Sequence, residues 1–187
     1  MNLRSTGLPG VLIFEPQVFE DDRGFFLEVF NAGHMAEAGI ETTFVQDNHS
    51  GSRQGVLRGL HYQLRRPQAK LVRVVVGEIF DVAVDLRRRS PTVGGWVGTR
   101  LSAANRLQQW VPAGFAHGFY VLSEWAEVTY KVSDYYEPGD EQTLRWDDPT
   151  VGIAWPLVDD RPPILAPKDG RGKPLAQAEL FDDPHQD

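Results

Sequence analysis

Short apolar runs separated by turn residues dominate this chain, and they predict an all-β protein. The first candidate strand, residues 11–19, is interrupted by Pro16, which places it at a sheet edge or at a bend. One short helix is expected between Asn31, its N-cap, and Gly39, which ends it. Further strands are predicted at residues 25–30, 95–101, 106–111, 118–122 and 126–134.

The clearest element is the segment 71–86, which is predicted to form two strands joined by a turn at residues 77–78. In the second strand, apolar positions at 80, 82, 84 and 86 alternate with Ile79, Asp81, Ala83 and Asp85. One face is therefore apolar and the other is mixed, as a barrel with a polar cavity requires. The expected fold class is an all-β jelly-roll barrel with a few short helices.

The length of 187 residues suits one domain, expected to span residues 1–187. The tail from about residue 181 is acidic and polar, and we expect it to be flexible. No apolar run approaches the ~20 residues that cross a bilayer, and the first residues lack the apolar core of a signal peptide. The chain also contains no cysteine. These features favour a cytoplasmic protein that does not bind membranes.

The formal net charge of −7 argues against a general nucleic-acid-binding protein. An anionic ligand would need positive side chains that are concentrated locally. The segment from Arg53 to Lys70 holds the densest group of Lys and Arg residues. Such a segment is typical of a solvated surface, and an anion site is the alternative.

Two histidines, His61 and His117, resemble the metal-binding histidines in the two halves of a cupin barrel. The usual first half offers His-x-His followed by Glu, but Gln63 replaces its second histidine and no Glu follows before Glu78. A catalytic zinc or iron site needs about three protein ligands. The remaining histidines lie outside both segments: His34, His49 and His185. A metal-free, cupin-like barrel is therefore favoured. A lone histidine is more often structural than catalytic, but here His61 is available for proton transfer.

Seven segments carry a resemblance to a known family: 21–26 (DDRGFF), 44–50 (FVQDNHS), 55–63 (GVLRGLHYQ), 80–87 (FDVAVDLR), 112–119 (PAGFAHGF), 146–149 (WDDP) and 168–169 (KD). They resemble the dTDP-4-dehydrorhamnose 3,5-epimerase family, and the resemblance runs in the family's order from about residue 7 to residue 180. It implies an isomerase without a metal or other cofactor. Its expected reaction inverts C3 and C5 of dTDP-4-dehydro-6-deoxy-D-glucose and gives dTDP-4-dehydro-L-rhamnose.

The implied reaction removes a proton next to a C4 ketone and returns a proton to the opposite face. It needs a base, an acid and a positive group near the C4 oxygen. In the family's pattern His61 is the base, and Asp169 fixes its tautomer and stabilises the imidazolium. Tyr130 matches the proton donor. Lys70 matches the group that holds the enolate oxygen, and as a nearby cation it would ease loss of the Tyr130 proton.

Each of these assignments has an alternative in the local sequence. Lys168-Asp169-Gly170 looks like a surface turn, and Asp81 or Asp85 is the alternative partner of His61. Lys70 also fits an ordinary surface lysine, and the family's usual Gln-Gly-Lys is Gln-Ala-Lys here, so its loop is expected to sit differently. Tyr130 also fits a core aromatic, with Tyr135 and Tyr136 as neighbours of the substrate.

The resemblance also implies a set of substrate-binding residues, with arginines on the diphosphate, polar side chains on thymine or the sugar, and an aromatic ring for stacking. In the family the segment 23–28 reaches into the neighbouring subunit's site, which implies a homodimer and gathers cations from two chains. The matched positions are Arg23, Phe26, Glu28, Gln46, Asn48, Arg58, His117, Glu141 and Lys168.

Three other functions remain open from the sequence. A mono-epimerase that inverts only C3 or C5, in a pathway to an antibiotic sugar, would use the same residues. A metal-dependent cupin is disfavoured by Gln63. A non-catalytic binder of sugar nucleotides has no need of His61, Lys70 and Tyr130 together.

Overall fold

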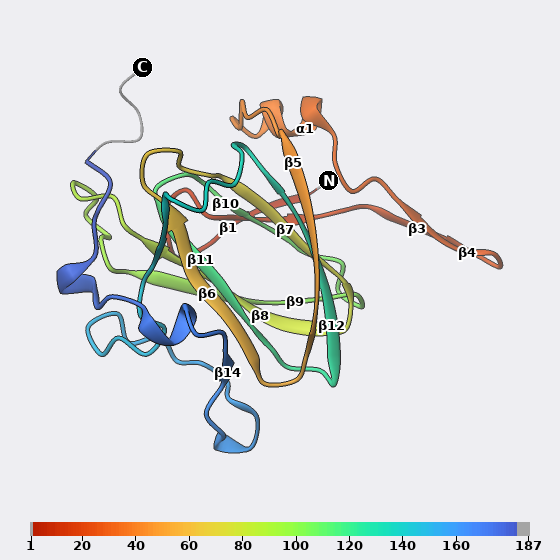
Figure 1. Ribbon diagram of the computed structural model, residues 1–187. Helices are drawn as coiled ribbons and strands as arrows, with labels where there is room; N and C mark the ends of the chain where they lie inside the picture. The colour runs from red at the N-terminus through yellow and green to blue at the C-terminus, as the bar shows by residue number, and fades with distance from the viewer. Residues whose placement is uncertain (1, 183–187) are drawn as a thin grey trace.

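The computed structural model describes residues 2–182 and contains two antiparallel sheets that face each other (Figure 1). The first sheet has the order β1 (Asn2–Ser5), β2 (Leu12–Glu15), β10 (Gln108–Val111), β7 (Lys70–Val76), β12 (Trp125–Val132) and β5 (Gln46–Arg53). The second has the order β13 (Glu141–Thr143), β6 (Val56–Gln63), β11 (Phe115–Val121), β8 (Glu78–Asp85) and β9 (Trp96–Ser102), and β14 (Ile164–Leu165) runs parallel to β6. The two sheets form the all-β jelly-roll barrel that the sequence predicts.

The other elements lie outside the barrel. β3 (Val18–Asp21) and β4 (Gly24–Leu27) form a separate hairpin that projects far from the sheets (Figure 1). The only α-helix of the described residues is α1 (Ala32–Glu37). Three short 3-10 turns lie in the C-terminal part: η1 (Val158–Asp160), η2 (Asp169–Arg171) and η3 (Leu175–Gln177).

The structure confirms the predicted break at Pro16, because β2 and β3 end and begin on either side of it and belong to different sheets. The predicted helix is also confirmed. The side-chain oxygen of Asn31 accepts hydrogen bonds from the backbone N–H groups of Gly33 and His34, at 2.9 and 3.3 Å. Gly39, with a φ of +76°, follows the end of this helix. Local capping chemistry therefore accounts for this segment.

Two differences from the predicted strands affect the site. β11 begins at Phe115 rather than at 118, so His117 lies within the strand and not just before it. β5 and β6 are not among the predicted strands, because polar residues and glycines interrupt their apolar pattern. Both strands line the inside of the barrel with functional side chains instead of apolar ones.

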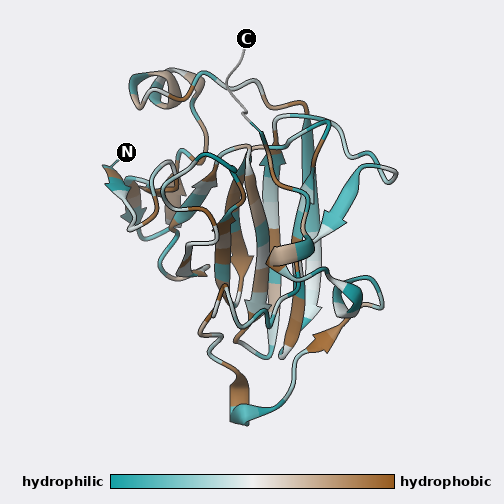
Figure 2. Cartoon of the chain, turned by 90° about the vertical axis from the view of Figure 1, so that its left-hand side faces the viewer, coloured by the Kyte–Doolittle hydropathy of each residue, from teal (hydrophilic) through white to brown (hydrophobic). Residues whose placement is uncertain are grey.

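The two faces of β8 have the roles that their composition predicts. Val82, Val84 and Leu86 pack under the C-terminal segment, in a cluster with Leu144 and Phe181. Ile79, on the other face, packs against apolar residues of the opposite sheet, so the mixed face points into the barrel. Figure 2 shows the apolar residues concentrated in the central strands.

The C-terminal segment covers the outer face of the second sheet. Phe181 is buried and its ring packs against Tyr62, at 5.8 Å between ring centroids. Phe181 therefore differs from the flexible tail expected from about residue 181, while residues 183–187, including His185, lie outside the described part of the chain. Among residues 2–182 we find no helix long and apolar enough to cross a membrane.

Candidate active site

A pocket of about 450 Å³ opens between the two sheets. Its walls come from β5, β6, β7, β11 and β12 and from the segment around η2. The fold brings most of the predicted site residues to this one cavity, although they come from positions spread over the chain. They are Gln46, Asn48, Arg58, His61, Lys70, His117, Tyr130, Glu141, Lys168 and Asp169.

His61 and Asp169 form an ion-pair-like contact at the pocket wall. His61 Nε2 lies 2.5 Å from Asp169 Oδ1, and Asp169 is only 2% exposed. Asp169 begins η2, which packs against β6, and this contact turns its side chain inward. The surface-turn alternative is therefore wrong for Asp169, and a carboxylate in this place fixes which ring nitrogen of His61 carries the proton.

His117 forms a second histidine–aspartate pair deeper in the barrel. Its Nε2 lies 2.8 Å from Asp81 Oδ1, and both side chains are buried. Asp81 is thus the partner of His117 and not of His61. Asp85, the other alternative partner, instead accepts hydrogen bonds from Arg87, Ser90 and Thr92.

A pair of glycines lets β6 and β11 approach closely where the two histidines face each other. A Cβ atom on Gly59 would lie 2.6 Å from the Cα atom of Gly118, so a side chain there would push the strands apart. The strand register also shifts just after His117. The Gly-containing segments that surround the two histidines therefore have a packing role.

Lys70 points into the pocket from the start of β7 and is 8% exposed. Burial lowers the pKa of its ammonium to about 8, and the negative charges of Asp81 and Glu141 act against this shift. Its position excludes the alternative of an ordinary surface lysine. A buried ammonium that has negative neighbours is suited to binding a developing oxyanion.

Tyr130 reaches the pocket from β12, next to Lys70's strand. Burial raises the pKa of its phenol, while the positive charges of Arg58 and Lys168 lower it. These two cations are on β6 and before η2, and the support expected from Lys70 stays a prediction. Tyr130 also contacts a hydrophobic cluster, so its ring packs against the core while the residue lines the pocket.

Charged and amide groups crowd the open end of the pocket. Lys168 Nζ donates to both carboxylate oxygens of Glu141, at 2.8 and 2.7 Å. Burial lowers the pKa of Lys168, but the contact with Glu141, together with nearby Tyr136 and Asp169, raises this pKa overall. Gln46 Nε2 donates to Asn48 Oδ1 at 2.8 Å and Gln46 Oε1 accepts from the backbone N–H of Tyr136 at 3.2 Å, so Asn48 Nδ2 is the group of this amide pair that can donate to a ligand. The open end therefore offers both charged and neutral hydrogen-bonding groups.

The structure does not bring the predicted residues of the hairpin to the pocket of their own chain. Arg23 pairs with Asp21 at 2.5 Å, and Phe26 at 69% exposure lies on the projecting hairpin. Glu28, just beyond β4, pairs with His34 at 3.0 Å. A hairpin with an exposed arginine and an exposed aromatic ring is suited to contact with a second molecule.

The dense cationic segment has a mixed role. Arg65 pairs with Asp140 and Arg66 pairs with Asp134, so these two arginines bind acidic residues of the protein itself. Arg58 and Lys70, in contrast, line the pocket. The positive charge that an anionic ligand would meet is therefore local, despite the net charge of −7.

The sequence did not predict the roles of two residues in the pocket, Asp81 and Gln63. Asp81 was considered only for His61, although its inward position on the mixed face of β8 pointed to the pocket interior. Gln63 was considered only as a missing metal ligand, yet it lines the pocket and is buried. No group of three or more His, Cys, Asp or Glu side chains among residues 2–182 is arranged to hold a metal ion.

Comparisons with known proteins give one consistent result. The family model for dTDP-4-dehydrorhamnose 3,5-epimerase matches residues 5–177. The enzyme of that name from Pseudomonas aeruginosa is 57% identical over 182 residues, which cover 97% of this chain and 99% of the relative. The relative of that name from Neisseria gonorrhoeae is 59% identical over 96% of this chain, which spans only about half (54%) of that protein's length.

A solved structure shares the fold closely. It is dTDP-6-deoxy-D-glucose-3,5-epimerase from Legionella pneumophila in complex with dTDP-4-keto-L-rhamnose, and it superimposes with a TM-score of 0.93 at 49% identity. The match covers 96% of this chain and 97% of the Legionella chain. At this similarity the likeness extends from the overall fold to the elements that build the pocket.

Proposed function

Because the chain belongs to the dTDP-4-dehydrorhamnose 3,5-epimerase family, we propose that it inverts C3 and C5 of dTDP-4-dehydro-6-deoxy-D-glucose and produces dTDP-4-dehydro-L-rhamnose. The observation that carries this proposal is the contact between His61 and buried Asp169 in a pocket that also holds Lys70 and Tyr130. These are the four groups that proton removal, proton return and enolate binding require.

His61 is the proposed base. With its Nε2–H donating to Asp169, the lone pair of Nδ1 is the one that accepts the proton from the carbon next to the C4 ketone. The ketone makes this proton acidic because the electrons left behind form an enolate. Asp169 stabilises the resulting imidazolium through a charge-assisted hydrogen bond.

Lys70 and Tyr130 complete the proposed reaction. Protonated Lys70 binds the enolate oxygen at C4, and the Tyr130 O–H gives its proton to the opposite face of the carbon that was deprotonated. Arg58 and Lys168 stabilise the phenolate that forms, which then regains a proton from solvent while His61 releases its own. The same cycle at the second carbon completes the double inversion, and no net proton is consumed.

Binding of the nucleotide is assigned to polar groups that line the pocket. Arg58 suits the diphosphate. Amides and charged side chains suit thymine and the sugar, and these are Gln46, Asn48, His117, Glu141 and Lys168. In a homodimer, the hairpin of one chain would place Arg23, Phe26 and Glu28 at the neighbouring pocket; its projection away from its own barrel supports this arrangement. The cytoplasmic location expected from the sequence stays a prediction.

The direct test is to incubate the enzyme with dTDP-4-dehydro-6-deoxy-D-glucose in deuterated water and to locate deuterium by NMR. We expect label at both C3 and C5 of an inverted product, and no label with His61→Asn. Label at one carbon would replace double inversion by the mono-epimerase alternative. No label would overturn the enzyme proposal, and activity that chelation removes and metal restores would favour a metal-dependent cupin.

A further inference from the structure

Gln63 occupies the next inward-facing position after His61 on β6 and is 3% exposed. A buried carboxamide is stable only if its donors and its acceptor find partners. Gln63 meets this condition with backbone groups of two different loops. One is the loop 64–69, which leads into Lys70, and the other is the loop 133–140, which follows the strand of Tyr130.

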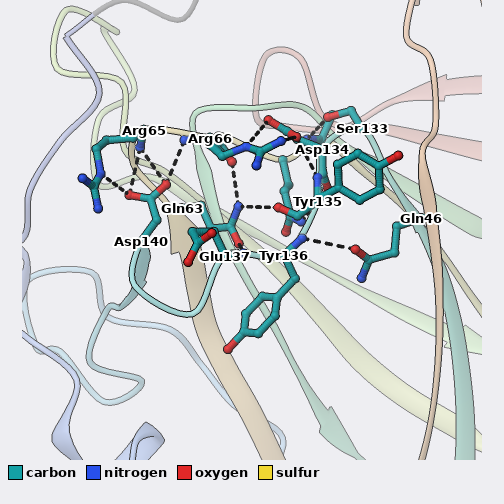
Figure 3. A network of polar contacts seen from close by, with 12 residues as sticks. Gln46, Gln63, Arg65, Arg66, Ser133, Asp134, Tyr135, Tyr136, Glu137 and Asp140 are labelled. Atoms are coloured by element: carbon teal, nitrogen blue, oxygen red, sulfur yellow. Dashed lines mark hydrogen bonds and ion pairs between the residues drawn. The ribbon is translucent and has the colours of Figure 1, made fainter.

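The hydrogen bonds of Gln63 join these two loops (Figure 3). Its Nε2 donates to the backbone oxygen of Arg66 at 2.8 Å and to that of Tyr135 at 3.2 Å. Its Oε1 accepts from the backbone N–H of Glu137 at 2.8 Å. The side chain of Gln63, on the same strand as His61, thus contacts both loops.

Acidic side chains connect the same loops at their outer ends. The carboxylate of Asp140, which is buried, accepts from the backbone N–H groups of Arg65 and Arg66 at 2.8 to 3.1 Å. Arg66 in turn pairs with Asp134 (Figure 3). The loop 133–140 is therefore held by Gln63 from the inside of the barrel and by the contacts of Asp134 and Asp140 with the loop 64–69. We call this set of contacts the clamp.

The clamped loop carries Tyr136 to the pocket wall. The Tyr136 backbone N–H donates to Gln46 Oε1 at 3.2 Å, and its hydroxyl lies 3.3 Å from Glu141 Oε2. Glu141 pairs directly with Gln63 in the register of β13 and β6. Through these contacts Gln63 helps to fix the position of Tyr136 at the pocket wall.

We propose that Gln63 is a positioning residue of the active site, which holds the loop 133–140 and Tyr136 in place and so sets the fit of the sugar ring. The inference deepens the proposed function and rests on it for the identity of the sugar. The amide is essential to this role because two backbone oxygens and one N–H face a single side chain. A methionine has none of the required groups, and a glutamate carboxylate would face two carbonyl oxygens with its negative charge.

The test compares Gln63→Met and Gln63→Glu with a matched control, Gln54→Met. Gln54 also donates its Nε2 to a backbone oxygen, that of Leu122 at 2.8 Å, but it lies at the far turn between β5 and β6 and is not part of the pocket. Amide hydrogen exchange of the peptide 133–140 is measured by mass spectrometry, and KM and kcat are measured with dTDP-4-dehydro-6-deoxy-D-glucose.

We expect Gln63→Met to speed exchange of the peptide 133–140 about tenfold and to raise KM by a similar factor, because at least one buried hydrogen bond is lost. Exchange of the β7 and β8 peptides should stay unchanged, and Gln54→Met should resemble the original protein. In Gln63→Glu, protonation at low pH restores one donor, so exchange corrected for its intrinsic pH dependence should slow toward the original value as pH falls.

Uniformly faster exchange of the whole barrel in Gln63→Met, or an unchanged peptide 133–140 with unchanged KM, would overturn the positioning role. If Gln63→Met does not fold, Gln63→Glu with its pH-dependent rescue decides the question alone. Loop exchange requires no turnover, so it judges Gln63 even if the original protein shows no epimerase activity; in that case only the function proposal fails.

Discussion

His61 and His117 lie directly opposite each other in the antiparallel register of β6 and β11, yet each binds a different aspartate. The side chain of His61 is 22% exposed, whereas that of His117 is 8% exposed. Asp169 comes from the C-terminal segment and Asp81 from the neighbouring strand β8. The two pairs look alike in chemistry and both histidines line the pocket, but the side chain of His61 is the more accessible.

The first prediction separates these two pairs. Asp169→Asn should lower kcat by about 10³-fold, because an amide no longer fixes the His61 tautomer or stabilises the imidazolium. Asp81→Asn should cost far less, since His117 does not take the proton. Steady-state kinetics of the two variants, with thermal melts to confirm folding, make the comparison. Equal losses would show that His117 takes part in proton transfer.

The second prediction concerns pH. Burial lowers the pKa of Lys70 to about 8, so the ammonium loses its charge as pH rises through that value. We therefore expect kcat/KM, which reports the free enzyme, to fall above this pH. Burial raises the pKa of Tyr130, so this residue keeps its proton over the same range. Lys70→Arg should move the fall to higher pH, and a fall that stays in place would assign it to another group.

The third prediction is that stability changes in the opposite direction over the same pH range. The folded chain binds the Lys70 proton more weakly than the unfolded chain, so below about 8 the protonated lysine destabilises the fold. This contribution disappears as pH rises from that value toward the ordinary pKa of lysine. The free energy of unfolding in urea is measured for the original protein and for Lys70→Met. The value of the original protein relative to that of the variant should rise with pH while kcat/KM falls. If both the free energy of unfolding and kcat/KM fell together, unfolding would be the cause of the lost activity.

Asp81 offers a further test of the charge on Lys70. Its carboxylate raises the pKa of Lys70, so Asp81→Asn should move the alkaline fall in kcat/KM to lower pH. Asp169→Asn is the matched control, because it removes the same charge from the other pair. If the alkaline fall in kcat/KM moved equally in both variants, the total charge of the pocket, and not Asp81 in particular, would set the pKa of Lys70.

The fourth prediction concerns Tyr130. Tyr130→Phe should reduce formation of inverted product by about 10² to 10⁴-fold, because the acid on the opposite face is lost. His61 still removes a proton and returns one to the original face. Recovered substrate should therefore carry deuterium without inversion, as NMR in deuterated water would show. Substrate without label would mean that Tyr130 also acts in the first step.

The fifth prediction tests whether the hairpin completes a neighbouring site. The double variant Arg23→Ala with Phe26→Ala should raise KM, because it removes an exposed cation and an exposed ring. Unfolding and refolding this variant together with inactive His61→Asn should restore activity. In a statistical mixture of dimers about a quarter of all sites combine an intact hairpin with an intact His61. Activity no higher than the sum of the separate variants would exclude a shared site.

Local sequence determined much of the fold. Period-two alternation in β8 identified an inner mixed face and an outer apolar face, and Asn31 and Gly39 marked the helix ends. The motif around His61 pointed to the base, and the order of motifs pointed to the family. These features depend on neighbouring residues, whose spacing along a strand or helix already defines which side chains share a face.

The tertiary structure decided which of these side chains meet. His61 could have paired with Asp81, Asp85 or Asp169, and only the packing of η2 on β6 selects the last, 108 positions away along the chain. Likewise, no local pattern shows that Gln63 holds two loops or that Phe181 is buried. Alternation assigns a side chain to a face of its own strand, but barrel closure and the path of the C-terminal segment decide what lies across from it.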